Sequence, residues 1–409
     1  MSQHGIARST RVRTEEQKLL EIERIKKYRA LEDQVRSRAS RTDYTAELFH
    51  LTSQLLRLNP EYYTTWNVRR RCLISSLLSK PSPGSSLSRA SPSSSPAATP
   101  TRPSASSSSS SSTAIPPSPG SPTAGTSGTT AEAGQTKDAE ILTSELTFTI
   151  PLLIDSPKCY WIWNYRLWIL QQIIERLPIA AARQVWEDEL GLASKMLNKD
   201  RRNFHAWGYR RQVVEKLESA VLEGQSMVEP EFAYTDKMIR TDLSNFSAWH
   251  RRSKLIPRLL DERRADDASR RAFLDKELAL IREALNVGPE DQSLWYYHQY
   301  LVLNLVTTAG RPTIAPALAT EDRVTYLTRE LVDIKDLLED YVGVKLIYEA
   351  LMEYTMYMCQ LEERKPDADE RAQLIEWLRQ LKKLDPMRKG RWEDAERDYG
   401  LAEPRFTIT

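Results

Sequence analysis

Apolar side chains recur every three or four positions along most of this 409-residue chain, the spacing that places them on one face of an α-helix. Each such stretch predicts an amphipathic helix with a single apolar stripe. Three stretches show the spacing clearly: Leu48, Leu51, Leu55 and Leu58; Trp186, Leu190, Ala193 and Leu197; and Leu274, Leu278, Ile281 and Leu285.

A short turn follows each amphipathic stretch, and a second helical segment follows the turn. Asn59-Pro60, Ser156-Pro157 and Gly288-Pro289 break the first helix in three units. Asn203 and Asn245 stand at the turn in the other two, and asparagine is favoured as a helix cap. We expect these residues to end one helix and cap the next, so each unit is predicted to be a helical hairpin.

The second helix of each hairpin carries one motif: an aromatic residue, a tryptophan three positions later and an arginine three positions after that. The complete sets are Tyr63/Trp66/Arg69, Tyr160/Trp163/Arg166, Phe204/Trp207/Arg210 and Phe246/Trp249/Arg252. A fifth, degenerate copy contains Trp295 and His298. We expect the tryptophan ring to fill the junction between neighbouring hairpins and the arginine to pack or pair beside it.

The motifs are spaced as in a repeat array. They span 59–71, 156–168, 202–213, 245–255 and 289–300, and their tryptophans Trp66, Trp163, Trp207, Trp249 and Trp295 are 97, 44, 42 and 46 residues apart. The long first gap contains residues 79–137, which are rich in Ser and Pro and lack aromatic side chains, so we expect a disordered insertion there. The predicted fold is all-α, an α-α superhelix of repeated helical hairpins that forms a crescent-shaped solenoid.

The chain is expected to have three parts. Residues 1–42 form an N-terminal tail and a charged helix that begins at Thr14, because Thr14 and Gln17 have the spacing of a capping box. Residues 43–320 hold the repeats and the insertion. Residues 321–409 carry no motif and are predicted to form C-terminal capping helices near 321–338, 341–363 and 367–383.

Composition narrows the possible functions. The chain has 58 Lys plus Arg against 56 Asp plus Glu, so we expect no nucleic-acid partner. Glycine is scarce, with 14 residues, which argues against an all-β or glycine-loop nucleotide-binding protein. Three widely spaced cysteines exclude a disulfide framework or a Cys-rich metal site. No apolar run reaches about eighteen residues, so no membrane insertion is expected, and we predict a cytoplasmic protein.

The repeated motif, preceded by Asn-Pro or Asn, resembles the repeat of protein prenyltransferase α subunits over about residues 43 to 305. Three further features resemble the α subunit of Rab geranylgeranyltransferase in its compact fungal form. They are the His4-Gly5 start, the run 51–56 before Asn59, and the tail 385–388. The shared α subunit of farnesyltransferase and type I geranylgeranyltransferase, which acts on CaaX proteins, is the alternative within the family. A non-catalytic helical-repeat scaffold is a further alternative.

The resemblance implies a crescent that wraps an α/α-barrel β subunit on a separate chain, which carries the zinc and most of the prenyl diphosphate pocket. The implied reaction transfers geranylgeranyl from geranylgeranyl diphosphate to the C-terminal cysteines of a Rab GTPase presented by an escort protein. Five histidines and three cysteines show no ligand spacing for a catalytic zinc within this chain. We therefore expect the chain to be inactive alone.

The resemblance also points to Lys158 and Tyr160, because the family's Pro-Lys-x-Tyr turn faces the active site and is intact at 157–160. Lys158 would contact the diphosphate, and Tyr160 would be a neighbouring donor. The corresponding position of the other repeats holds Glu61, Arg202, Ser244 and Glu290, so the repeat itself does not require lysine there. Trp161 stands where the family usually tolerates a smaller residue.

A second turn of the same family pocket contains Arg202, Asn203 and His205. Asn203 and His205 are candidate polar residues at the subunit junction; the alternative is a helix cap and an imidazole satisfied at the interface. His4, near the amino terminus, is a candidate for reaching the partner's zinc and blocking it until substrate arrives. The alternative for His4 is an untethered tail.

Overall fold

The computed structural model describes residues 14–79, 127–306 and 313–401, and every regular element in those ranges is a helix. The chain forms two compact units, Met1–Leu190 with Ala220–Glu223, and Gly191–Ser219 with Gly224–Thr409. The all-α prediction is therefore confirmed for the described residues. None of the helices in those ranges is long and apolar enough to span a membrane.

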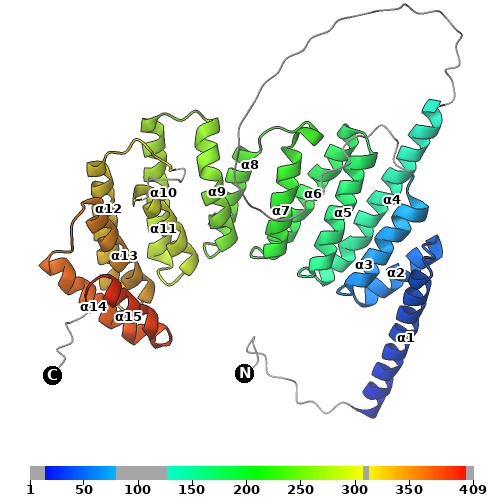
Figure 1. Cartoon of the computed structure of the whole chain (residues 1–409), viewed down its shortest axis with the longest axis horizontal. Helices are drawn as coiled ribbons and strands as arrows, with labels where there is room; N and C mark the ends of the chain where they lie inside the picture. The colour runs from blue at the N-terminus through cyan, green and yellow to red at the C-terminus, as the bar shows by residue number, and fades with distance from the viewer. Residues whose placement is uncertain (1–13, 80–126, 307–312, 402–409) are drawn as a thin grey trace, which may run out of the picture. The chain divides into compact units, whose positions relative to one another are not determined.

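The first unit begins with a helix whose start the sequence predicts correctly. Thr14 caps α1 (Glu15–Ser40) in a capping box with Gln17. The elements that follow are α2 (Ala46–Leu58), α3 (Tyr63–Cys72), the π-helix η1 (Leu73–Leu77), α4 (Ser127–Asp155), α5 (Tyr160–Arg176), the first part of α6 (Ile179–Lys199) and the short η2 (Ala220–Leu222) (Figure 1).

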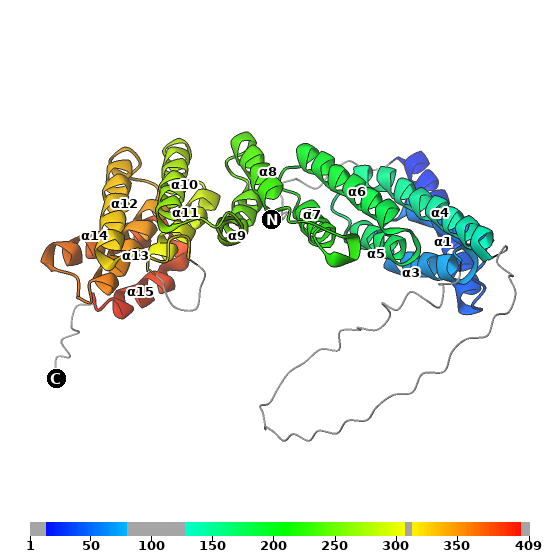
Figure 2. The ribbon, with the colours of Figure 1, turned by 90° about the horizontal axis from the view of Figure 1, so that it is seen from above.

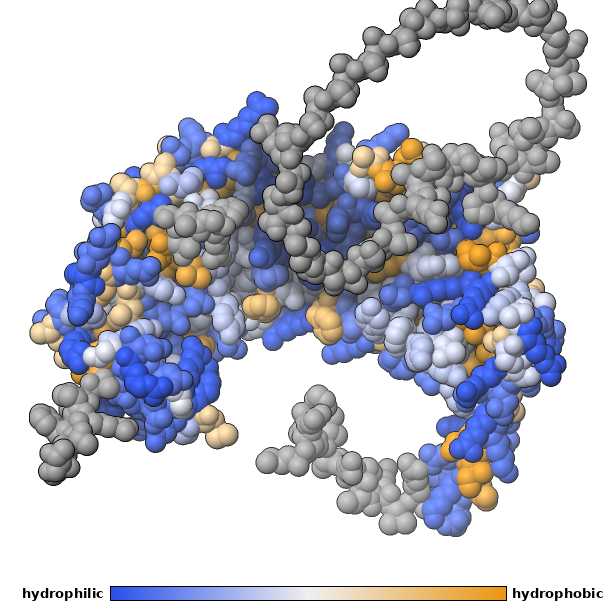
Figure 3. All heavy atoms as spheres, viewed as in Figure 1, coloured by the Kyte–Doolittle hydropathy of each residue, from blue (hydrophilic) through white to orange (hydrophobic). Residues whose placement is uncertain are grey.

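The amino-terminal half of α1 has an apolar surface that no other described element covers. Leu19, Leu20, Ile22 and Ile25 are exposed, whereas Val35, further along the same helix, is buried against α2 and α3. Figure 3 shows apolar atoms on α1 between hydrophilic ones. Only the second half of α1 therefore belongs to the core of the first unit.

The second unit contains the rest of the array. Its elements are α7 (Phe204–Leu217), α8 (Val228–Thr241), α9 (Phe246–Glu262), α10 (Asp267–Val287), α11 (Gln292–Val306), α12 (Thr320–Asp340), α13 (Lys345–Leu361), α14 (Ala368–Leu384), η3 (Pro386–Arg388) and α15 (Lys389–Asp398), after the end of α6. In this unit α8, α10 and α12 form one layer and α9, α11 and α13 the other (Figure 2). The helices predicted near 321–338, 341–363 and 367–383 are present.

The structure describes residues at both ends of the predicted insertion. Residues 127–137, expected to be disordered, belong to α4. Asp138 is buried in α4 and accepts hydrogen bonds from the backbone nitrogen and the hydroxyl of Ser79, at 2.9 and 2.6 Å. These bonds anchor Ser79, which therefore belongs to the folded body. Residues 80–126, the rest of the predicted insertion, lie outside the described residues.

Each motif tryptophan is buried and its indole nitrogen donates to the carbonyl six residues earlier. The bonds are Trp66 to Pro60 (2.8 Å), Trp163 to Pro157 (2.9 Å), Trp207 to Arg201 (2.9 Å), Trp249 to Leu243 (2.8 Å) and Trp295 to Pro289 (2.7 Å). The Trp66 ring lies 4.6 Å from that of Tyr165 in the next repeat. The tryptophans thus hold each second helix against its turn, and Trp66 packs at a hairpin junction, as predicted.

Each motif arginine is buried and forms an ion pair with a glutamate on the first helix of the next hairpin. The pairs are Arg69–Glu145 (2.6 Å), Arg166–Glu189 (3.1 Å from Nε), Arg210–Glu231 (2.5 Å) and Arg252–Glu277 (2.6 Å). Each guanidinium also donates a hydrogen bond to a hydroxyl group of its own hairpin. The acceptors, in chain order, are Thr52, Thr149, Ser194 and Thr235. The prediction that the arginines form pairs is confirmed, and their partners are these glutamates.

The turns are capped differently from the prediction in two repeats. Asn203 and Asn245 cap α7 and α9 through their side-chain oxygens, as predicted. Asn59 instead ends α2, and the N-caps of α3 and α5 are Tyr62 and Cys159, which make no side-chain capping bond. In all four repeats the second helix begins three residues before its tryptophan, but Asn59 and Ser156 lie seven residues before the tryptophan and so are too far upstream to cap that helix.

The hairpin pattern continues beyond the last motif. His298 takes the arginine's place in the fifth repeat, with Nε2 3.0 Å from a Glu330 carboxylate oxygen and Nδ1 2.8 Å from the Tyr354 hydroxyl. In the α12–α13 hairpin the hydroxyl of Tyr348 donates to the carbonyl of Val342, six residues earlier, at 2.8 Å. A tyrosine there makes the bond that tryptophan makes elsewhere.

Replacing Arg252 by alanine should destabilise the chain by about 3–5 kcal/mol, because it leaves the buried Glu277 carboxylate without its cation. Denaturant unfolding followed by circular dichroism measures the loss. Arg240→Ala is the control: Arg240 is exposed and pairs with Asp236 on its own helix, so its removal should not measurably shift the unfolding midpoint. Equal stability of Arg252→Ala and the parent chain would contradict a structural role for the pair.

Candidate functional site

Lys158 lies in the turn between α4 and α5, held in place by the backbone around it. The Ser156 amide donates to the Leu152 carbonyl at 2.8 Å, and the Cys159 amide donates to the Ser156 carbonyl at 3.0 Å. Trp163 fixes the intervening Pro157 carbonyl. Lys158 is exposed, so the buried part of the repeat positions a cation on the surface of the turn.

Aromatic side chains from two repeats stand beside this turn. The ring of Trp161 lies 5.3 Å from that of Tyr63, at the start of α3, and 5.2 Å from that of Tyr160, edge-on. Trp161 is partly buried, whereas Tyr63 and Tyr160 are about half exposed. Lys158 therefore stands next to a packed aromatic cluster, whose Tyr160 hydroxyl is a further hydrogen-bond donor.

The second predicted turn, with Arg202, Asn203 and His205, belongs to the second unit. Arg202 makes two bonds to the Asp242 carboxylate, at 2.7 and 2.9 Å, and these bonds raise the pKa of Arg202 and lower that of Asp242. Asp242 thus already balances the charge of Arg202.

The structure supports the capping role considered for Asn203. Asn203 is buried, and its side-chain oxygen accepts from the amides of His205 and Ala206, at 3.0 and 3.2 Å. The partly buried imidazole of His205 packs 4.0 Å from the Phe204 ring. Their contribution to a subunit junction stays a prediction.

The first residue of the second helix is an exposed aromatic in four repeats. Tyr63, Tyr160, Phe204 and Phe246 are 53, 54, 68 and 49% exposed, although the tryptophan three positions later is almost fully buried in each case. Sequence reasoning missed this difference, because it grouped both aromatics in one motif. The same position of the repeat therefore leaves a large ring exposed four times.

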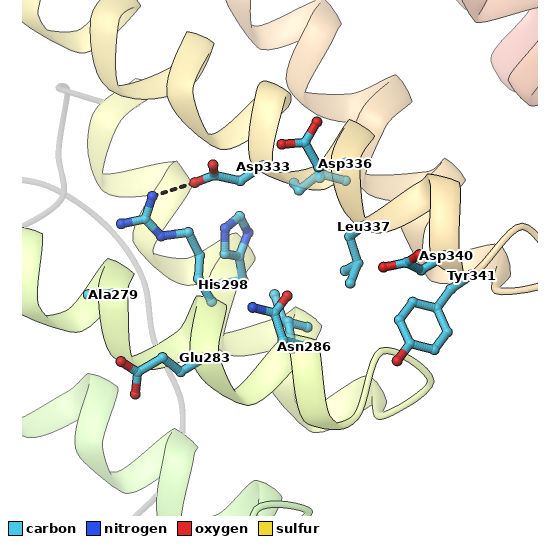
Figure 4. Close-up of a pocket in the computed structure, with 12 residues that line it drawn as sticks. Ala279, Glu283, Asn286, His298, Asp333, Asp336, Leu337, Asp340 and Tyr341 are labelled. Atoms are coloured by element: carbon cyan, nitrogen blue, oxygen red, sulfur yellow. Dashed lines mark hydrogen bonds and ion pairs between the residues drawn. The ribbon is translucent and has the colours of Figure 1, made fainter.

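A pocket of about 620 Å³ lies between α10, α11 and α12 and reaches the buried His298 (Figure 4). Sequence reasoning did not locate it. Its ionisable lining consists of Arg282 and His298 with four carboxylates, Glu283, Asp333, Asp336 and Asp340. Arg282 pairs with Asp333 and lies 3.7 Å from Glu330. This excess of negative charge makes the pocket unsuitable for a diphosphate.

Comparison with known proteins identifies the family. A model described as the protein prenyltransferase alpha subunit repeat matches residues 46–75, 142–173, 186–217, 228–259 and 274–305, the five hairpins. The geranylgeranyl transferase type-2 subunit alpha of Schizosaccharomyces pombe is 30% identical over 95% of this chain and 96% of that protein. The chain belongs to the protein prenyltransferase alpha subunit family.

Other relatives show which member of the family this alpha subunit resembles. The geranylgeranyl transferase type-2 subunit alpha of Candida albicans is 29% identical over 96% of this chain and 97% of that protein. The Rattus norvegicus protein of that name is 28% identical over 70% of this chain, but the match covers only 39% of the rat protein. The predicted likeness to the compact fungal form of this alpha subunit is confirmed.

The cysteine beside Lys158 is not a nucleophile in this alpha subunit. Cys159 is buried, its sulfur lies 3.4 Å from the Pro60 carbonyl oxygen, and burial raises its pKa to about 11. Burial also raises the pKa of Cys72 to about 11 and increases that of Cys359. Because the thiolate is the reactive form, none of the three thiols suits nucleophilic chemistry at neutral pH.

The described part of the alpha subunit does not fit a catalytic zinc. Within residues 14–79, 127–306 and 313–401 no three His, Cys, Asp or Glu side chains are grouped so that they could hold a metal ion. His4, the candidate for contact with a partner's zinc, lies outside the described residues.

The raised thiol pKa values predict slow labelling. At about pH 8, where an ordinary cysteine is partly ionised, a disulfide exchange reagent should label the folded chain far more slowly than a small thiol. In denaturant all three cysteines should react at the ordinary rate. Fast stoichiometric labelling of the folded chain would contradict the buried placement of Cys72 and Cys159.

Proposed function

We propose that this chain is the alpha subunit of a heterodimeric geranylgeranyltransferase that modifies the C-terminal cysteines of Rab GTPases. The donor is geranylgeranyl diphosphate, an escort protein presents the GTPase, and the reaction takes place in the cytoplasm. The observation that carries the proposal is the exposed Lys158 on a turn fixed by Trp163, in a chain whose relatives over nearly its full length are type-2 alpha subunits.

In the proposed reaction, this chain would only stabilise the departing diphosphate. A thiolate sulfur forms a bond to the first carbon of the prenyl chain while the bond from that carbon to the diphosphate oxygen breaks. Negative charge grows on the departing diphosphate, and a fixed cation or donor beside it lowers the barrier. Lys158 would supply the cation, and the Tyr160 hydroxyl would supply a hydrogen bond.

The other requirements point to a partner subunit. A zinc ion, when bound, keeps the substrate thiol deprotonated, and the described residues do not form a site for it. The acidic charge of the pocket between α10, α11 and α12 does not suit the diphosphate. We infer that the beta subunit holds both, and that the exposed aromatic residues Tyr63, Tyr160, Phe204 and Phe246 contribute to the surface that contacts it.

Coexpression with candidate beta subunits tests the function. We expect a stable 1:1 complex that uses geranylgeranyl diphosphate and a Rab GTPase only when escort protein is added. Activity on short CaaX peptides without escort protein would instead favour the farnesyl and type I alternative. Failure to form a complex with any prenyltransferase beta subunit would favour the non-catalytic scaffold.

Lys158→Ala should lower kcat by about 10- to 100-fold without affecting assembly, because one charge-stabilising contact is lost at an exposed position. Lys158→Arg should retain more activity, since the charge is kept. Lys276→Ala removes an exposed lysine from α10 and should leave kcat unchanged. Steady-state kinetics of the purified complexes provide the comparison. A wild-type kcat for Lys158→Ala would remove Lys158 from the site.

A further inference from the structure

A second pocket, of about 290 Å³, opens between α9 and α11, the second helices of the fourth and fifth repeats. We call it the aromatic pocket. It is lined by Phe246, Trp249, His250, Ser253, Lys254, Ser293, Tyr296, Tyr297 and Tyr300. Phe246 belongs to the set of exposed first-position aromatics, so the pocket continues the surface that we assign to the beta subunit.

The walls of the aromatic pocket are held in place before any partner binds. The ring of Phe246 lies 6.0 Å from that of Tyr296, edge-on, and 5.9 Å from the His250 imidazole, stacked. The Tyr300 hydroxyl donates to the Ser253 carbonyl at 2.9 Å, which ties α11 to α9. Phe246 and Tyr296 are nevertheless about half exposed. Rigid rings with free surface lose little entropy on binding, as anchor sites require.

The surroundings of the aromatic pocket are positively charged. Lys254 lines the pocket, and burial together with the charges of Lys254, Arg211 and Arg251 lowers the pKa of His250. Arg251 is 3.6 Å from Glu231, but Lys254 is exposed and makes no ion pair with any described residue. The pocket therefore combines apolar walls with one cation, Lys254, available to an anion.

We propose that the aromatic pocket receives an anchor segment of the beta subunit in which an aromatic or aliphatic side chain is adjacent to an acidic one. The apolar side chain would enter between Phe246 and Tyr296, and the carboxylate would pair with Lys254. This inference rests on the heterodimer proposed above. The cation in the pocket lining favours an occupant with a carboxylate, and Phe246 is one of the exposed aromatic residues that we assign to contact with the beta subunit.

Binding kinetics of purified alpha variants with the beta subunit test the anchor site. Phe246→Ala should weaken binding by about tenfold or more, mainly through faster dissociation. Lys254→Glu should weaken it by a similar factor through slower association, with a smaller dependence on salt. Lys237→Glu makes the same charge change at an exposed position on α8, outside the pocket lining, and should stay near wild type. Unfolding midpoints confirm that the variants fold.

The outcomes separate this inference from the proposed function. Wild-type affinity of both pocket variants would overturn the anchor site and leave the heterodimer intact. An equal loss in Lys237→Glu would overturn it too, because only net charge would then matter. Loss of escort-protein binding with unchanged beta-subunit binding would assign the pocket to another partner and contradict the proposal. If the wild-type chain binds no beta subunit, the proposed function fails together with the inference.

Discussion

A buried arginine–glutamate pair joins consecutive hairpins of the array. The guanidinium comes from the second helix of one hairpin and the carboxylate from the first helix of the next, and both are almost fully excluded from water. Either charge would be costly to bury alone, so the hairpins must dock in the one register that brings the two together. The pair thus specifies how one repeat follows another.

The arginine of this junction lies beyond the first turn of each second helix, which leaves the amino end of that helix available for function. Tryptophan fixes the preceding turn and arginine fixes the next hairpin, so the turn residue and the first helical residue need not enter the core. In the second repeat, Lys158 is the turn residue and Tyr160 is the first residue of the helix. In the fourth repeat, Phe246 is the first residue of the helix. The proposed cation and the proposed anchor site therefore both lie at these exposed positions of the repeat.

Sequence periodicity predicted the hairpins, the buried tryptophans and the start of α1, because each depends on residues close together in the chain. The glutamate partners were not predicted, since they follow their arginines by 76, 23, 21 and 25 residues with no constant spacing. The hairpin after the fifth motif was not predicted as a further repeat, because Tyr348 stands there in place of the motif tryptophan. Lys158 was found only through family resemblance; the aromatic pocket was not found, because the sequence does not show that Phe246 and Tyr296 stay exposed.

We infer that the turn bearing Lys158 faces the substrate in the complex with the beta subunit. Hydrogen–deuterium exchange can be compared between the chain alone, the complex, and the complex with geranylgeranyl diphosphate. We expect slower exchange in peptides covering residues 156–166 when the beta subunit binds, and a further decrease when the diphosphate is added. Unchanged exchange of those peptides in a catalytically active complex would show that this turn lies away from the substrate.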